Sequence, residues 1–246
     1  MKLGWVDIQR STQSNAGLGA TLSFVAGATN AGGFLAVGVY TSHMTGAVSS
    51  VADNLVLGQW VLVWLGLASV LAFLGGAMTT ALMVNWCLRR NLRSAFARPL
   101  LVEAALLLIF GLFGAVIESK DSVLIPSTVM LLCYIMGLQN AVITKISSAV
   151  IRTTHVTGLI TDLGIELGKM VYINSNNRST TRVRANRQKL LIHLQLVSSF
   201  FIGALCGAFG FKYLGYISTL PLAFALVVLV WKPLHYDFKV WVSSRA

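Results

Sequence analysis

Two stretches of this chain carry the same polar residues in the same order. Asn30 is followed by SHMTG at 42–46, and Asn140 is followed by THVTG at 154–158. After each Thr-Gly comes a segment that holds an Asp and ends in Leu-Gly. A series of this length indicates an internal repeat rather than chance. Amide, hydroxyl and imidazole groups can hold a small solute by hydrogen bonds, and the candidate solute-binding residues are Asn30, His43, Thr45, Gln139, Asn140, His155 and Thr157.

The asparagines have two interpretations, which are not exclusive. Amides bridge neighbouring helices inside a bilayer, with a contribution of roughly 0.6–2 kcal/mol, so Asn30 and Asn140 could serve helix packing. They could also line a central site. His43 and His155 could form structural hydrogen bonds or cap helices, or stand at helix N-termini that attract anions. A shared metal or haem site is disfavoured, because the topology derived below places the two histidines at opposite membrane faces.

Glu103 is the one carboxylate inside a strongly apolar run. Ionisable residues within a membrane are functional candidates by default, so Glu103 could couple transport to a proton or cation. The alternative is that it lies shallow and pairs with Arg98 or another arginine of the connection between the second and third spans. Asp162 is the second candidate coupling residue. With Glu166 and Lys169, however, it has the helical spacing of a solvated face.

Signatures of enzymes and metal proteins are missing from the sequence. The three cysteines lack metal-ligand spacing, and there is no nucleotide-binding loop or nucleophile motif. We therefore expect no metal, no cofactor and no enzymatic activity.

The composition indicates a membrane protein. Of the 246 residues, 56% are hydrophobic and only 11% are charged, compared with about 25% charged in soluble domains. Runs of about 20 apolar residues are typical of membrane-spanning helices. The first fifteen residues are polar, and we expect no cleaved signal peptide. The prediction is an all-α protein with six transmembrane helices in the lipid bilayer, at roughly 17–40, 60–84, 99–117, 123–144, 189–211 and 216–231.

Lysine and arginine set the predicted orientation. Seventeen of the 19 lie in the two termini and in the connections after the second and fourth spans. The positive-inside rule then puts both termini in the cytoplasm, together with a basic loop at 174–188. The net charge of +11 is therefore mainly a topology signal, and we expect no nucleic-acid partner.

This orientation has a consequence for the repeat. The single domain, 1–246, divides into repeat A at about 16–117 and repeat B at about 123–231. Each repeat has three spans, an odd number, so the second must run upside down relative to the first. Inverted repeats are a recurrent plan of secondary transporters, whose substrate binds near the bilayer midplane between the repeats.

These residues and motifs together resemble the YoaK family of six-span bacterial membrane proteins of unknown function. The similarity covers nearly the whole chain, and its specific parts are the stretch ending in 42–46, the segment 137–141 and the segment 153–158. The resemblance implies a bacterial inner-membrane protein but no substrate. Where the family commonly has Asp and Asn, this chain has Asn30 and Ala47, and the missing carboxylate weakens any ion coupling at position 30.

The leading prediction is a secondary transporter or permease for an unknown small solute. The alternatives are a passive channel or facilitator, which conducts without alternating states, and a membrane scaffold that transports nothing. Because six spans resemble half of a larger twelve-span carrier, we also expect a homodimer, by analogy of fold alone.

Overall fold

The computed structural model describes residues 12–117, 125–147, 153–174 and 182–243. Within these ranges the ordered elements are all helical, with no strand. The helices are α1 (Thr12–Val37), α2 (Met44–Val56), α3 (Trp60–Arg89), α4 (Ala97–Ile117), α5 (Ile125–Ile146), α6 (Val156–Val171), α7 (Arg187–Leu214) and α8 (Thr219–Ser243), with short 3-10 helices at Arg93–Ala95 and Gly215–Ser218.

Within the described part of the chain, five helical stretches are long and apolar enough to cross a membrane. The last of them, 187–243, contains both α7 and α8. The candidate span with the most apolar window is α3, and only 17% of that window is buried inside the protein. Its outer face, with Trp64, Leu71 and Leu82 more than 60% exposed, is typical of a helix that faces lipid. The chain thus has the helices of a membrane protein.

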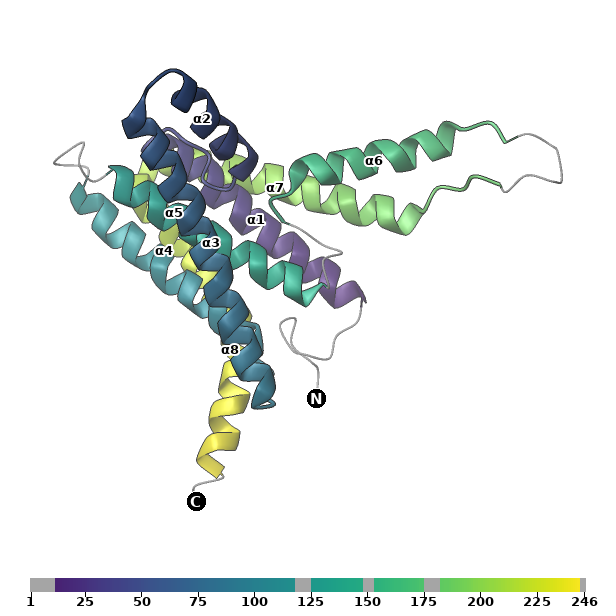
Figure 1. Ribbon diagram of the computed structural model, residues 1–246. Helices are drawn as coiled ribbons and strands as arrows, with labels where there is room; N and C mark the ends of the chain where they lie inside the picture. Colours follow the sequence, from purple (N-terminus) through teal and green to yellow (C-terminus); the bar gives the residue numbers. More distant parts are fainter. Residues whose placement is uncertain (1–11, 118–124, 148–152, 175–181, 244–246) are drawn as a thin grey trace.

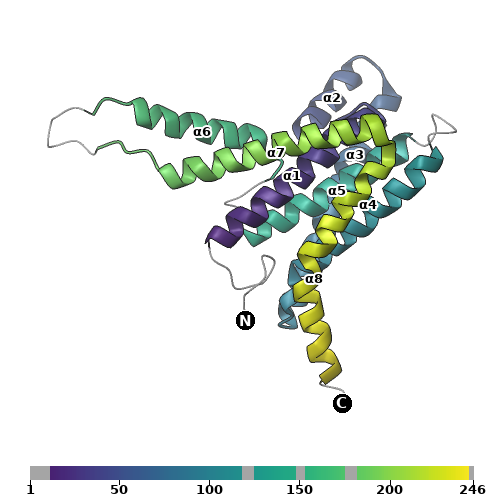
Figure 2. The same ribbon diagram turned by 180° about the vertical axis from the view of Figure 1, so that it is seen from behind.

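The long helices pack in pairs (Figures 1 and 2). Helix α1 lies against α7, α3 against α5, and α4 against α8. Where α1 crosses α7, an added Cβ on Gly27 would overlap the Phe200 carbonyl, and one on Gly203 would overlap the Phe24 carbonyl. The backbones touch because both helices have glycine at the crossing, as is common between membrane helices.

The crossing of α3 and α5 repeats this arrangement. A Cβ on Gly76 would overlap the Tyr134 carbonyl, and one on Gly137 would overlap the Phe73 carbonyl. One turn further along α3, the Thr80 hydroxyl donates a hydrogen bond to the Leu138 carbonyl at 3.0 Å. Each of the four helices therefore contributes an aromatic residue three positions before its glycine, so both crossings are built from the same sequence pattern.

Replacing Gly137 with Ala is expected to destabilise the fold by about 1–3 kcal/mol, because overpacking at a backbone contact forces the helices apart. Gly164→Ala on α6 is the matched control, since Gly164 has open space around it and Ala is the better helix former. Thermal unfolding of both variants in the same detergent makes the comparison. Equal melting temperatures would contradict a backbone contact at the α3–α5 crossing.

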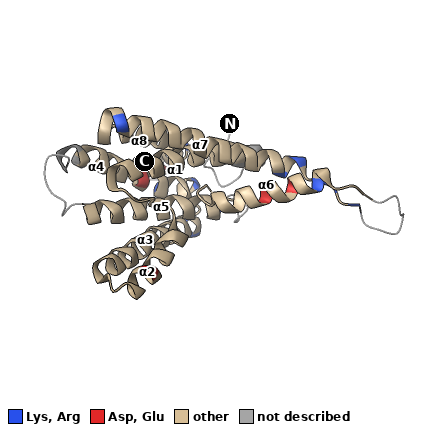
Figure 3. Cartoon of the chain, turned by 90° about the horizontal axis from the view of Figure 1, so that it is seen from above, with Lys and Arg blue, Asp and Glu red and all other residues tan. Residues whose placement is uncertain are grey.

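Two shorter helices complete the fold as hairpins. Helix α2 packs on α3, and α6 packs on α7. The α6 helix and the first half of α7 extend away from the remaining helices as an arm (Figures 1 and 2). Viewed from above, this arm carries both acidic and basic residues, whereas α3 and α5 are almost free of them (Figure 3).

The predicted helical segments coincide with six of these helices, but several ends differ. Helix α3 continues to Arg89 and α8 to Ser243, beyond the predicted 84 and 231. The predicted basic loop at 174–188 falls partly outside the described residues. Its described ends are joined by two hydrogen bonds between the Asn174 side chain and the Val183 backbone, and α7 already begins at Arg187.

Candidate functional site

The side chains of Asn30 and Asn140 each accept hydrogen bonds from the polar segment that follows their own helix. The Asn30 side-chain oxygen accepts hydrogen bonds from the Ser42 amide at 3.1 Å and the Ser42 hydroxyl at 2.9 Å. The Asn140 oxygen accepts one from the Thr154 hydroxyl at 2.6 Å. No hydrogen bond given for the described residues joins Asn30 to Asn140. Both amides thus fix the position of the motif in their own half of the chain.

The repeated histidines are at the N-cap positions of α2 and α6, but neither side chain makes a capping hydrogen bond. A Cβ on Gly46 would overlap the His43 ring, and one on Gly158 would overlap the His155 ring. The glycine of each Thr-Gly pair therefore leaves room for the imidazole. Thr45 and Thr157 are exposed. Helix capping by the histidine side chains, one interpretation of the sequence, is wrong for this structure.

The first motif opens onto a cavity of about 440 Å³ between α1, α2, α3 and α5. This volume is within the range of small-molecule sites, roughly 300–1,000 Å³. Helix α5 contributes Ile125, Val129 and Cys133, so both predicted repeats line the cavity. The described lining residues with a polar side-chain group include Tyr40, Thr41, His43, Ser50, Asn54 and Ser69.

Thr41 is a buried residue of the cavity wall whose hydroxyl has no hydrogen-bond partner among the described residues. Its side chain is 1% exposed. The Ser69 hydroxyl, by contrast, donates to the Leu65 carbonyl at 2.9 Å. A buried hydroxyl without a partner costs roughly 1–3 kcal/mol, so Thr41 marks a position where a bound molecule would gain a hydrogen bond.

The second motif leads into a charged cluster between α6 and α7. The Glu166 carboxylate accepts hydrogen bonds from Lys169 at 2.8 Å and from the Asn186 amide at 2.6 Å. Asp162 lies 3.4 Å from the Lys189 ammonium and 3.7 Å from His193 Nδ1. The predicted solvated face is wrong for Glu166, which is 2% exposed, because α7 covers it. Asp162 is 39% exposed and lies at the edge of the cluster.

The cavity and the charged cluster occupy matching places in the two halves. Counted from the motif histidines, Ser50 corresponds to Asp162, because each lies seven residues after its histidine (His43 or His155). Counted from the glycines of the helix crossings, Gly66 corresponds to His193, because each lies ten residues before its glycine (Gly76 or Gly203). Four residues of the cavity wall have a counterpart in the cluster by this count: Ser50 and Asp162, Asn54 and Glu166, Leu62 and Lys189, Gly66 and His193. The Phe/Tyr-x-x-Gly pattern is the sequence signal that could have revealed this alignment.

The Glu166 environment predicts how the arm responds to pH. The hydrogen bond from Lys169, and then that from the Asn186 amide, lower the pKa of the Glu166 carboxyl. A lowered pKa gives a stabilisation that is present above the usual glutamate value of about 4.3 and is lost as the pH falls through the lowered pKa. The α6–α7 contact should therefore be unchanged between about pH 7 and pH 5 and loosen only in stronger acid.

Spin-label distances between α6 and α7 would check this, with Glu166→Gln as a variant that should be loose at every pH. The other titratable and charged groups at this contact are Asp162, Lys169, Lys189 and His193. Loosening between pH 7 and pH 5 would contradict control by Glu166 and point to His193 instead.

The two remaining polar candidates are buried inside the bundle. Glu103, on α4, is fully buried, and neither carboxyl oxygen has a hydrogen-bond partner among the described residues. Arg98 instead donates to the Ser94 hydroxyl at 3.1 Å, so the alternative of a shallow Glu103–Arg98 pair is wrong. Gln139 is also fully buried, and its amide donates to the Leu22 carbonyl at 3.1 Å.

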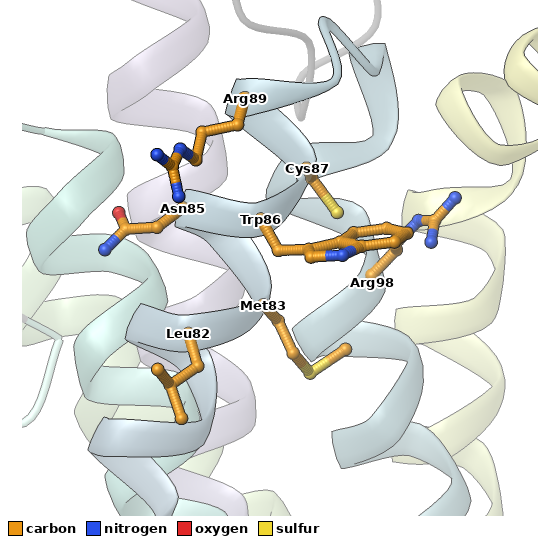
Figure 4. Close-up of a pocket in the computed structure, with 7 residues that line it drawn as sticks. All are labelled: Leu82, Met83, Asn85, Trp86, Cys87, Arg89 and Arg98. Carbon is orange, nitrogen blue, oxygen red and sulfur yellow. The ribbon is translucent and has the colours of Figure 1, made fainter.

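A second hollow lies at the basic end of α3 (Figure 4). It is lined by Leu82, Met83, Asn85, Trp86, Cys87, Arg89 and Arg98. The Arg90 guanidinium lies 4.2 Å and that of Arg98 5.4 Å from the Trp86 ring centre. Figure 4 shows Arg89 and Trp86 on different sides of the helix, so the hollow follows the surface of α3. It includes none of the repeated motif residues, and the α1–α2–α3–α5 cavity remains the candidate site.

The family comparison covers all of the site residues described above. A family model described as "Protein of unknown function (DUF1275)" matches residues 18–231. The chain belongs to this family. The match confirms the resemblance to a YoaK-like family of unknown function that the motifs indicated. No curated protein and no solved structure matched the chain.

Proposed function

We propose that this DUF1275 member is a secondary transporter or permease for a small solute. The observation that carries the proposal is the pairing of an open cavity at the first motif with a charge-filled contact at the second. A transporter that alternates access needs such a difference, because only one side of its site is open at a time. We propose six membrane spans in a bacterial inner membrane, with both termini cytoplasmic, and neither enzymatic activity nor a nucleic-acid partner.

The helix pairing supports an inverted repeat of three plus three spans. If α1, α3 and α4 of repeat A correspond to α5, α7 and α8 of repeat B, the α1–α7 contact is the counterpart of the α5–α3 contact. The remaining large contact, α4 with α8, joins counterparts to each other. A two-fold axis produces this set of contacts, and the same aromatic-glycine pattern at both crossings agrees with it.

Under this topology the cavity opens toward the outside and the charged cluster closes the cytoplasmic side. The cavity is lined by both repeats, as a solute site between inverted repeats should be. Glu103 is the proposed coupling residue, since a buried carboxyl without a partner is stable only in its neutral form. Asp162 takes a different role from the predicted coupling, because its lysine and histidine neighbours make it part of the closed contact.

Cysteine labelling tests the inversion. Gln59 and Gln188 are exposed residues at the starts of α3 and α7, which are counterparts. A membrane-impermeant thiol reagent should label Gln59→Cys only from outside intact cells and Gln188→Cys only after the cytoplasmic face is opened. Labelling of both from one side would remove the inverted repeat.

Flux measurements separate transport from the alternatives. The purified protein in proteoliposomes should move at least one member of a panel of small metabolites, with saturation and with dependence on an imposed pH gradient. Saturation without gradient dependence would favour a facilitator. Flux equal to that of empty vesicles across the panel would favour a scaffold.

Cross-linking in membranes tests the homodimer, which rests on fold analogy alone.

A further inference from the structure

The chemistry of the cavity wall limits what the cavity can hold. Its described lining contains no Lys, Arg, Asp or Glu. Aromatic and aliphatic side chains form most of the wall, among them Phe34, Tyr40, Met44, Leu65, Ile125 and Val129. Moving a charged solute out of water into such a wall is costly without a counter-charge. An uncharged solute avoids this cost.

The cavity wall disfavours charged solutes, and Thr41 favours a solute that has a hydrogen-bonding group. Its hydroxyl is buried at the wall without a partner, whereas the Ser69 hydroxyl is already bonded to a backbone carbonyl. The Asn54 side-chain NH2 group is also used, because it donates to the Ser50 carbonyl at 2.7 Å. A solute with one hydroxyl or carbonyl group could pair with Thr41 while its apolar part covers the wall.

The second hairpin shows what the same framework does with charges. There the counterparts of Ser50, Asn54, Leu62 and Gly66 are ionisable, and they bond to one another or to the backbone. They close the α6–α7 contact instead of lining a space. The absence of Lys, Arg, Asp and Glu from the cavity wall is therefore a difference between two related sites, and it coincides with the open cavity.

We infer that the α1–α2–α3–α5 cavity binds an uncharged, largely apolar small molecule that carries a hydrogen-bonding group for Thr41. The bound molecule is a transport substrate only under the function proposed above. The substrates of that site would then be neutral amphiphilic molecules rather than ions, amino acids or phosphorylated metabolites.

Thiol labelling at Ser50 tests the charge selectivity. Cys87, Cys133 and Cys206 are the only cysteines, and replacing all three with Ala gives a background for Ser50→Cys. Propyl, sulfonatoethyl and trimethylammonioethyl methanethiosulfonates, which are neutral, anionic and cationic, are the probes. Gln59→Cys, exposed at the start of α3, is the matched control for reagent reactivity.

After division by the rates at the Gln59→Cys control, the neutral reagent should react at Ser50→Cys at least about tenfold faster than either charged reagent, a difference of about 1.4 kcal/mol. Equal normalised rates would overturn the inference, and so would a preference for either charged reagent. Because labelling uses nanodisc protein without a gradient, it can succeed where flux fails. That result would keep the neutral site and remove the transport function.

A second measurement tests the role of Thr41. Benzyl alcohol and toluene have similar shapes and differ in a hydroxyl group. At equal concentrations in the membrane phase, benzyl alcohol should slow propyl labelling of Ser50→Cys severalfold more than toluene does. Adding Thr41→Val should abolish the difference, and Thr41→Ser, which keeps the hydroxyl, should preserve it. Equal protection by the two compounds in the Thr41 protein would overturn the hydrogen-bonding requirement.

Discussion

Replacing Glu103 with Gln is expected to abolish gradient-driven flux, with a loss of at least about a hundredfold, while the protein still folds. The carboxyl is fully buried and has no partner among the described residues. An ionised carboxylate in that position would be unfavourable by several kcal/mol, so proton binding and release there must accompany a change of its surroundings. Gln keeps the shape of the side chain and cannot release a proton.

The measurement compares uptake of a solute identified in proteoliposomes, with and without a pH gradient, at several pH values. Asp53→Asn, an exposed acid on α2, is the control and should retain the wild-type profile. Thermal stability of Glu103→Gln should stay close to wild type. If flux and its pH dependence survive in Glu103→Gln, Glu103 is a structural residue and the coupling group lies elsewhere.

The second large effect is expected from replacing two residues of the charged cluster with their uncharged counterparts in the first hairpin. Asp162→Ser combined with His193→Gly gives the second hairpin the residues that the first has at Ser50 and Gly66. This change removes the contacts of Asp162 with Lys189 and His193 and leaves an open space between α6 and α7. We expect solute accumulation to collapse toward equilibrium, because both sides of the site can then be open at once.

Labelling at Leu196 provides a readout that needs no solute. Leu196 is 1% exposed and is the counterpart of Ser69 in the cavity wall. In a background without other cysteines, Leu196→Cys should react at least about tenfold faster from the cytoplasmic side when the double substitution is present, since the population of the opened state rises. Lys212→Gln, at the other end of α7, is the control. Unchanged labelling would show that the cluster does not close this side.

Several features of the site were predictable from residue order because they depend on local chemistry. Asn30 and Asn140 were identified as equivalent, and both bond to the hydroxyl residue before the histidine of their own motif. A position at a helix start was one of the alternatives for the histidines, and both lie there. Their side-chain roles were not predictable, because whether an imidazole caps a helix depends on its rotamer, and here each ring packs against a glycine one turn later.

The correspondence between the cavity and the charged cluster could not be read from the motifs alone. Ser50 and Gly66 are unremarkable small residues, and Asp162 and His193 lie 31 positions apart. Whether these residues line a cavity or form a closed contact depends on which face of α2 meets α3 and which face of α6 meets α7. Helical periodicity leaves several faces possible for a short amphipathic helix.

The sequence by itself determined the helices and the family, because apolar length and repeated motifs are properties of local segments. Only the tertiary structure decided the partners. It buried Glu103 away from Arg98, brought Glu166 under α7, and left the buried Thr41 hydroxyl in the cavity wall without a partner among the described residues. The physical reason is that these outcomes follow from where the glycine crossings let the helix backbones meet, and side-chain burial is fixed by such long-range contacts rather than by neighbours in the sequence.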